Sequence, residues 1–174
     1  MKFLKLTFVL LLLFSNFKVY AQTLDLYTIN QAQALEKSLE IKYSYRKAKN
    51  TEVDFEKFKS IISGLENSNL KEAYMAAQTM LSSKFKKNPF SKISNFKKGR
   101  EKLEELFLDY SNSLELRYIR LAVQLNTPAL LSYRDNIEED KNFILNEIKT
   151  SKILAADIKT YLLDFLRRYE LINS

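Results

Sequence analysis

Residues 91–125 read SKISNFKKGREKLEELFLDYSNSLELRYIRLAVQL. Apolar or small residues recur in the first part at intervals of three and four positions: Phe96, Gly99, Leu103, Leu106 and Tyr110. That spacing places them on one face of an α-helix. A polar turn follows, and Ser113 has the side chain expected of an N-cap for a second helix over 114–125. The stretch therefore predicts two helices joined by a short turn.

The rest of the chain extends this pattern in both directions. Thr51, Asn69 and Asp135 are the expected N-caps of three further helices, and Asn88-Pro89 separates two of them. A short helical turn is expected after Pro128. We expect about seven helices, at the following approximate ranges: 24–49, 51–65, 69–85, 91–109, 114–125, 135–149 and 153–171. The expected fold is all-α, built of antiparallel helical hairpins.

The segment 24–49 has two interpretations. Ala32, Leu35 and Leu39 have helical spacing, whereas Ile41, Tyr43 and Tyr45 alternate as in a strand. We favour a helix, because a lone strand in a helical chain has no partner.

The pattern from Gly99 to Val123 also fits one tetratricopeptide (TPR) repeat. A small residue, an aromatic or apolar core, a polar turn at Ser111 and the core of the next helix fall at the offsets of that repeat. Ser111 stands where the repeat prefers proline, and the chain has no tryptophan. A short TPR-like array is therefore expected, with a plain helical bundle as the alternative.

The runs 88–99, 115–124 and 128–141 resemble a family of uncharacterised exported proteins of Gram-negative bacteria. The resemblance covers roughly residues 70–145. It implies a helical, TPR-like fold and a signal peptide. It implies no activity and no functional residues.

Composition excludes several classes of chemistry. The 174 residues include no His, no Cys and only two Gly. Without imidazole or thiol groups, a His-based triad, a zinc finger and a disulfide are impossible. Two glycines cannot form a Gly-rich phosphate loop. We therefore expect no cofactor, no metal and no catalytic residue.

The first 21 residues have the organisation of a signal peptide. Lys2 and Lys5 precede the nine-residue apolar run 6–14, and Val19-Tyr20-Ala21 places small residues where a signal peptidase reads them. A membrane span needs about 20 apolar residues, so an uncleaved anchor is the weaker interpretation. We expect cleavage before Gln22, one domain over 22–174, and a periplasmic or outer-envelope location.

The segment 84–102 is strongly basic, with Glu101 as its one acid. Its basic residues are Lys84, Lys86, Lys87, Lys92, Lys97, Lys98, Arg100 and Lys102. One interpretation is a surface that binds anions such as lipid head groups. The other is a solvated helix face whose phenylalanines belong to the core. Nucleic acid would normally be absent from the expected compartment.

A second candidate site lies on the helix expected over 114–125. Arg117, Arg120 and Gln124 share one face, with Tyr118 and Tyr133 as further candidates for partner contact. The arginines could line a groove that binds a partner protein. Alternatively, they could pair with acids on the next helix, which are Asp135, Glu138, Glu139 and Asp140.

Those four acids alone do not predict a metal site, because no second cluster faces them. A Ser-x-x-Lys pattern can mark a serine nucleophile. It occurs here five times, so in a lysine-rich chain it carries no specificity.

The sequence thus predicts an exported, non-catalytic helical module that binds a protein partner in the cell envelope. The alternative is a peripheral binder of anionic envelope lipids through the segment 84–102. An enzyme ranks third.

Overall fold

The computed structural model describes residue 23 and residues 28–173. Its contacts divide the chain into two units, Met1–Ser38 and Leu39–Ser174. Residues 28–38 of the first unit and residues 39–47 of the second are helical. The expected signal peptide and its cleavage site before Gln22 lie outside the described residues. Export and a single domain over 22–174 stay predictions.

The second unit is built of α-helices and two short 3₁₀ turns, with no strand over the described residues. Including the helix at 28–47, the described part of the chain has seven α-helices, which confirms the all-α prediction. After residue 47 the elements are α2 (Glu52–Ser63), α3 (Asn69–Ser82), η1 (Ser83–Phe85), α4 (Pro89–Tyr110), α5 (Leu114–Asn126), η2 (Ala129–Leu131), α6 (Ile137–Thr150) and α7 (Ala156–Arg168).

The strand-like alternation in the first segment is resolved in favour of a helix. Ile41 and Tyr45, four positions apart, are buried, whereas Tyr43 between them is exposed. One helical turn places the first two on the same face and the third on another.

Most helix starts follow the predicted caps. Thr51 and Ser113 accept hydrogen bonds from the backbone N–H groups of α2 and α5. Asn88-Pro89 was expected only to separate two helices, but Asn88 caps α4 and Pro89 is its first residue, two positions before the expected start at 91. Two predictions were wrong by one residue. Ser68 rather than Asn69 caps α3, and α6 follows Asn136, which makes no side-chain cap bond, rather than Asp135.

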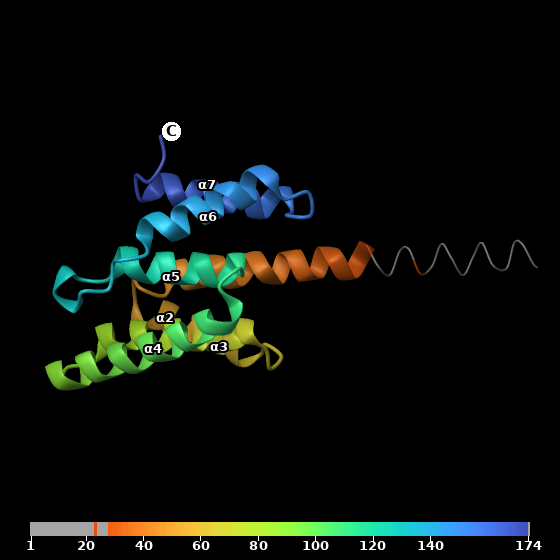
Figure 1. Cartoon of the computed structure of the whole chain (residues 1–174). Helices are drawn as coiled ribbons and strands as arrows, with labels where there is room; N and C mark the ends of the chain where they lie inside the picture. Colours follow the sequence, from red (N-terminus) through yellow and green to blue (C-terminus); the bar gives the residue numbers. More distant parts are fainter. Residues whose placement is uncertain (1–22, 24–27, 174) are drawn as a thin grey trace, which may run out of the picture. The chain divides into compact units, whose positions relative to one another are not determined.

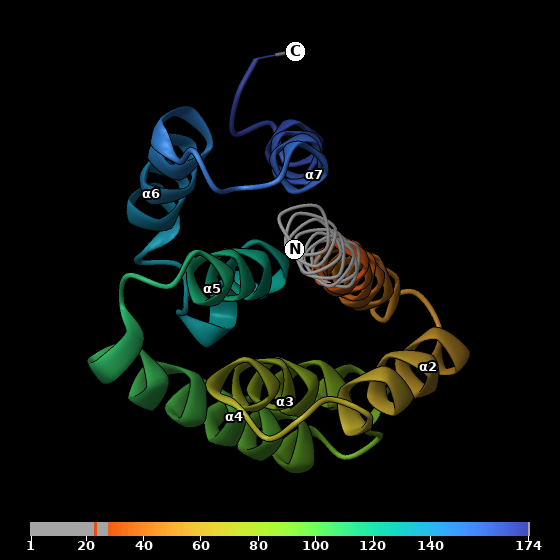
Figure 2. The same ribbon diagram turned by 90° about the vertical axis from the view of Figure 1, so that its right-hand side faces the viewer.

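The second unit has three layers (Figures 1 and 2). Helices α2, α3 and α4 form one layer, residues 39–47 and α5 the next, and α6 and α7 the third. Tyr45 connects the first two layers, because its ring packs against Phe58 of α2, Tyr74 of α3 and Tyr118 of α5. Tyr161 of α7 donates a hydrogen bond to the carbonyl oxygen of Lys42, which connects the second and third.

Helices α3 and α4 pack closely because Gly99 has no side chain. A Cβ at Gly99 would lie 2.6 Å from the carbonyl oxygen of Ala76 and 2.8 Å from the backbone nitrogen of Met80. Asn95 of α4 contacts Ser82 near the end of α3, and Lys102 contacts Glu72 near its start, so the pair is antiparallel. The TPR-like arrangement itself is not established by these contacts and stays a prediction.

No helix in the described part of the chain combines the length and the apolar character that a membrane crossing requires.

Candidate functional site

The two arginines of α5 belong to a buried ion-pair cluster. Asp140 of α6 is fully buried and accepts from both: its Oδ1 lies 2.8 Å from Arg117 Nη1, and its two oxygens each lie 2.7 Å from nitrogens of Arg120. Glu139 also pairs with both arginines. The ring of Phe107 lies 3.6 Å from Arg120 Cζ. The interpretation that these arginines pair with acids of the next helix is confirmed for Glu139 and Asp140, whereas Glu138 pairs with Lys141.

In this cluster, the positive charges of the two arginines are balanced by the carboxylates of Glu139 and Asp140. Hydrogen bonds from Arg117 and then Asn136 hold the pKa of Glu139 below its ordinary value. Burial acts to lower the pKa of Arg117, but hydrogen bonds with Glu139 and Asp140 outweigh it, so that pKa is raised. Every guanidinium here therefore has carboxylates to neutralise it.

The prediction of an open partner groove on α5 was wrong. Arg117, Arg120, Gln124, Tyr118 and Tyr133 are all buried. Every residue from Leu116 to Gln124 is buried, because α5 lies in the middle layer and is covered on several sides. Sequence periodicity treats charged side chains as surface, and it cannot show that a second helix covers them.

The eight basic residues of segment 84–102 do not form one patch. Lys86 and Lys87 are exposed after η1, and Arg100 stacks on the ring of Tyr133 at 4.8 Å. Lys102 pairs with Glu72 and Glu105. Lys97 and Lys98 border a shallow depression with Phe90 and Glu101. Each residue of a helix is rotated about 100° from the last, which distributes the lysines of α4 around its axis.

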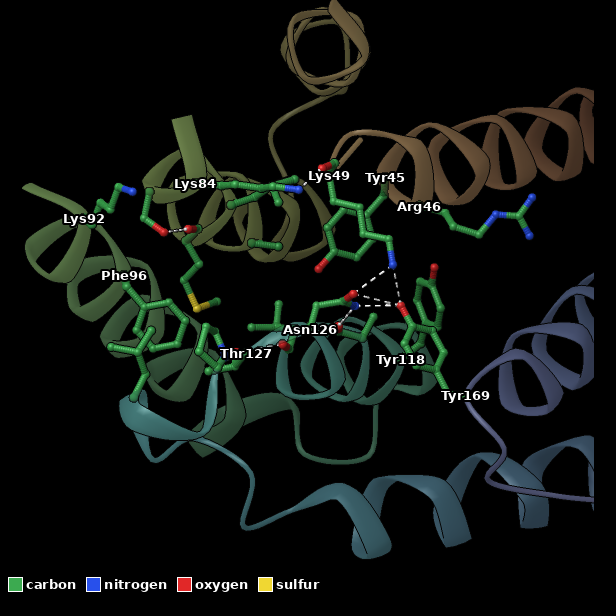
Figure 3. Close-up of a pocket in the computed structure, with 18 of the residues that line it drawn as sticks. Tyr45, Arg46, Lys49, Lys84, Lys92, Phe96, Tyr118, Asn126, Thr127 and Tyr169 are labelled. Carbon is green, nitrogen blue, oxygen red and sulfur yellow. Dashed lines mark hydrogen bonds between the residues drawn. The ribbon is translucent and has the colours of Figure 1, made fainter. Parts of the chain in front are cut away.

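The remaining two basic residues of this segment, Lys84 and Lys92, line a pocket of about 430 Å³ (Figure 3). The pocket lies within the second unit. Its walls come from the end of the helix at 39–47, α3, η1, α4, α5, η2 and α7. Its cations are Arg46, Lys49, Lys84 and Lys92, and none of the described residues that line it is acidic.

The inner wall of this pocket is apolar. Met80, Phe96, Ala122 and Val123 line it and are themselves buried. Ile93 lies at its outer edge with 44% of its surface exposed. Such a wall takes apolar groups from water, and the cations beside it favour a negative charge on the same molecule.

Lys49 is half-buried at the wall of this pocket. Its Nζ donates to Asn126 Oδ1 at 2.8 Å and to the Tyr169 hydroxyl at 2.9 Å, and it lies 5.2 Å from the centre of the Tyr169 ring. Both partners are neutral. Figure 3 shows these hydrogen bonds at the pocket wall. Lys84 reaches the same place, because its Nζ donates to the backbone oxygen of Lys49.

The pocket differs in this respect from the interior of the unit. The buried cations Lys42, Arg117 and Arg120 each pair with a carboxylate. Over the described residues, neither Lys49, Lys84 nor Lys92 forms such a pair, whereas Arg46 lies 3.6 Å from Asp164. In the same part of the chain, no three acidic residues come together as a metal site.

The sequence identified Lys84 and Lys92 but missed Lys49, Asn126 and Tyr169. Asn126 and Tyr169 lie 77 and 120 residues from Lys49 along the chain. No local pattern connects residues at that distance, so only the fold brings them together.

Comparison with known proteins adds no relative. No family model matches the chain, and no curated protein or solved structure matches it. The resemblance to an exported TPR-like family therefore stays a prediction.

Proposed function

We propose that this protein is a non-catalytic binding module of the cell envelope, and that its pocket binds an amphipathic anion. One observation carries the proposal: Lys49 lies half-buried at an apolar pocket with neutral partners only. A cation partly removed from water gains from an opposite charge placed beside it. The bound anion would supply that charge.

The neighbouring charges support this assignment. Lys84 and Lys92 add positive charge at the same pocket, and no acid among the lining residues offsets it. Like charges at one pocket repel one another, and an anion that enters relieves this repulsion. An anionic group would therefore be held more tightly than a neutral one of the same shape.

The size and lining of the pocket support a ligand rather than solvent alone. Its volume of about 430 Å³ falls within the roughly 300–1,000 Å³ that is usual for small-molecule sites. Apolar walls supply most of the affinity in such sites, and a few polar groups fix the orientation. The sequence predicts a protein partner. Such a partner could occupy the pocket only by inserting an apolar segment.

The test is binding of 8-anilinonaphthalene-1-sulfonate, a fluorescent amphipathic anion. We expect saturable binding that weakens at least about tenfold in a K49M/K84Q variant, since charge-assisted hydrogen bonds contribute about 1.5–3 kcal/mol. The matched control is K97Q/K98Q, which removes the same charge from segment 84–102 outside the pocket. Equal weakening in both variants would contradict the proposal.

A second candidate function is docking on an anionic membrane through segment 84–102. Phe90 favours it, because 83% of its surface is exposed and it follows the exposed Lys86 and Lys87 closely along the chain. Exposed aromatic and basic residues at one site are typical of peripheral membrane binding. Flotation with phosphatidylglycerol vesicles should then require Phe90, Lys86 and Lys87 but not Lys49. Flotation that survives the loss of all three would exclude this function.

A further inference from the structure

We infer that the ligand is a single acyl chain that ends in a carboxylate, with the carboxylate at Lys49 and the chain along the wall formed by Val123, Met80 and Phe96. This rests on the proposed function and specifies the chemistry of the same pocket. The polar part of the pocket indicates the carboxylate, and the apolar part indicates the acyl chain.

The polar part of the pocket suits a carboxylate. Lys49 carries three N–H donors and uses two of them on Asn126 and Tyr169, so one remains for a ligand. Lys84 uses one donor on the Lys49 carbonyl oxygen and retains two. A carboxylate accepts several hydrogen bonds at its two oxygens, and bonds to ammonium groups are among the stronger ones.

The apolar part suits a chain without hydrogen-bonding groups. Its inner wall is made of the side chains of Met80, Phe96 and Val123. The hydroxyl groups of Ser83 and Thr127 are already engaged: Ser83 donates to the Met80 carbonyl oxygen, and Thr127 donates to the Val123 carbonyl oxygen. A peptide in this part would leave its own N–H and C=O groups without partners, which is costly away from water. An acyl chain has no such groups.

The length of the apolar wall limits the length of the acyl chain that the pocket can hold. Along α5 and the residue that follows, the pocket is lined from Tyr118 to Thr127, which spans about 13 Å at 1.5 Å per residue. An extended chain of single bonds covers about 1.2 Å per bond, judged from the three bonds of a peptide residue. The full wall therefore accommodates at most about eleven bonds, or about twelve carbons, and this is an upper limit because the head-group site at Lys49 lies beside Asn126 within that span. Ile93, which is partly exposed, marks the edge beyond which a longer chain reaches water.

The test is a series of saturated carboxylates from six to fourteen carbons, measured by calorimetry on the purified protein below their micelle concentrations. Each methylene that enters the pocket should improve the Kd about fourfold, which corresponds to ~0.8 kcal/mol per buried methylene. We expect the gain to stop at or before about twelve carbons. Alcohols and trimethylammonium ions of equal length should bind at least about tenfold more weakly.

Two variants separate the two parts of the pocket. K49M should weaken every carboxylate by a similar factor and leave the gain per methylene unchanged. I93S, at the partly exposed edge, should reduce the gain for the longest chains alone. Thermal melting of both variants checks that they fold, and K84Q repeats the head-group test at a residue that is exposed.

The outcomes distinguish this inference from the proposed function. If the aromatic sulfonate binds through Lys49 but chain length has no effect, the acyl inference is wrong and the proposed function stands. If a peptide with an apolar carboxyl terminus binds more tightly than every fatty carboxylate, the acyl inference is again wrong. If no anion binds at the pocket, both are wrong.

Discussion

Replacing Asp140 by asparagine tests the interpretation that the buried arginine cluster stabilises the fold. Asp140 has no exposed surface and accepts three hydrogen bonds, one from Arg117 and two from Arg120. Asparagine has nearly the same shape but no charge, and it replaces one acceptor oxygen by an NH₂ donor. The variant therefore leaves two buried guanidinium groups without their central counter-ion.

The expected loss is large. Removing one partner of a buried ion pair costs about 3–5 kcal/mol, because the remaining charge stays desolvated. The other acids of the cluster compensate weakly, since the side chains of Glu139 and Glu104 are 55% and 37% exposed and solvent screens them. Because asparagine retains one acceptor oxygen, we expect the lower end, about 3 kcal/mol. In a domain of this size that corresponds to a Tm lower by roughly 6–12 °C.

The assay is urea unfolding followed by circular dichroism at 222 nm, with E138Q as the matched control. Glu138 lies on the same helix, its side chain is 72% exposed and it pairs with Lys141. The control should change the free energy of unfolding by less than about 0.5 kcal/mol. A loss below about 1 kcal/mol in D140N would refute the reasoning, because it would mean that the exposed acids suffice to neutralise both arginines.

Three further predictions concern packing, pH and capping. G99A should lower the free energy of unfolding by about 1–3 kcal/mol, because its Cβ meets the backbone of α3 at Ala76 and Met80; chemical denaturation measures this, and an unchanged midpoint would contradict the close packing of α3 on α4. Burial raises the pKa of Tyr161 to about 12, whereas an unfolded tyrosine titrates near 10. The folded protein therefore keeps a proton that the unfolded chain loses, and stability should fall as the pH rises from 10 to 12; a urea midpoint that stays constant over that interval would exclude it. T51A should cost about 1 kcal/mol through the lost cap of α2, measured against T150A at the exposed end of α6.

The elements of the fold were predictable because their signals are local. The spacing of Phe96, Leu103 and Leu106 defines the buried face of α4. Its start was expected at about residue 91, because Asn88-Pro89 was interpreted as a break, whereas the helix begins at Pro89. The cap of α3 was misplaced by one residue, since Ser68 and Asn69 both have side chains that can cap a helix. Local sequence signals thus predict where each helix lies. They do not decide which of two adjacent capping residues, such as Ser68 and Asn69, becomes the N-cap.

The arrangement of the helices was not predictable from such signals. Arg117 and Arg120 read as a polar face, and the sequence left open whether a partner or the next helix would cover it. The answer depends on α6 lying alongside α5 with Asp140 between the two arginines. Likewise, Lys49 becomes a candidate site residue only because α5 and α7 bring Asn126 and Tyr169 to it.

Basic residues have different partners on the two sides of α5. Arg120 and Ala122 are two positions apart, so their side chains point about 200° apart around the helix. On the Arg120 side, each guanidinium meets carboxylates from α6, and the charge is neutralised within the fold. On the Ala122 side, the lysines around the pocket meet neutral groups, although acids are common elsewhere on the surface. The fold pairs its buried cations but leaves Lys49 beside an apolar pocket without a carboxylate, and an anion from outside can bind there.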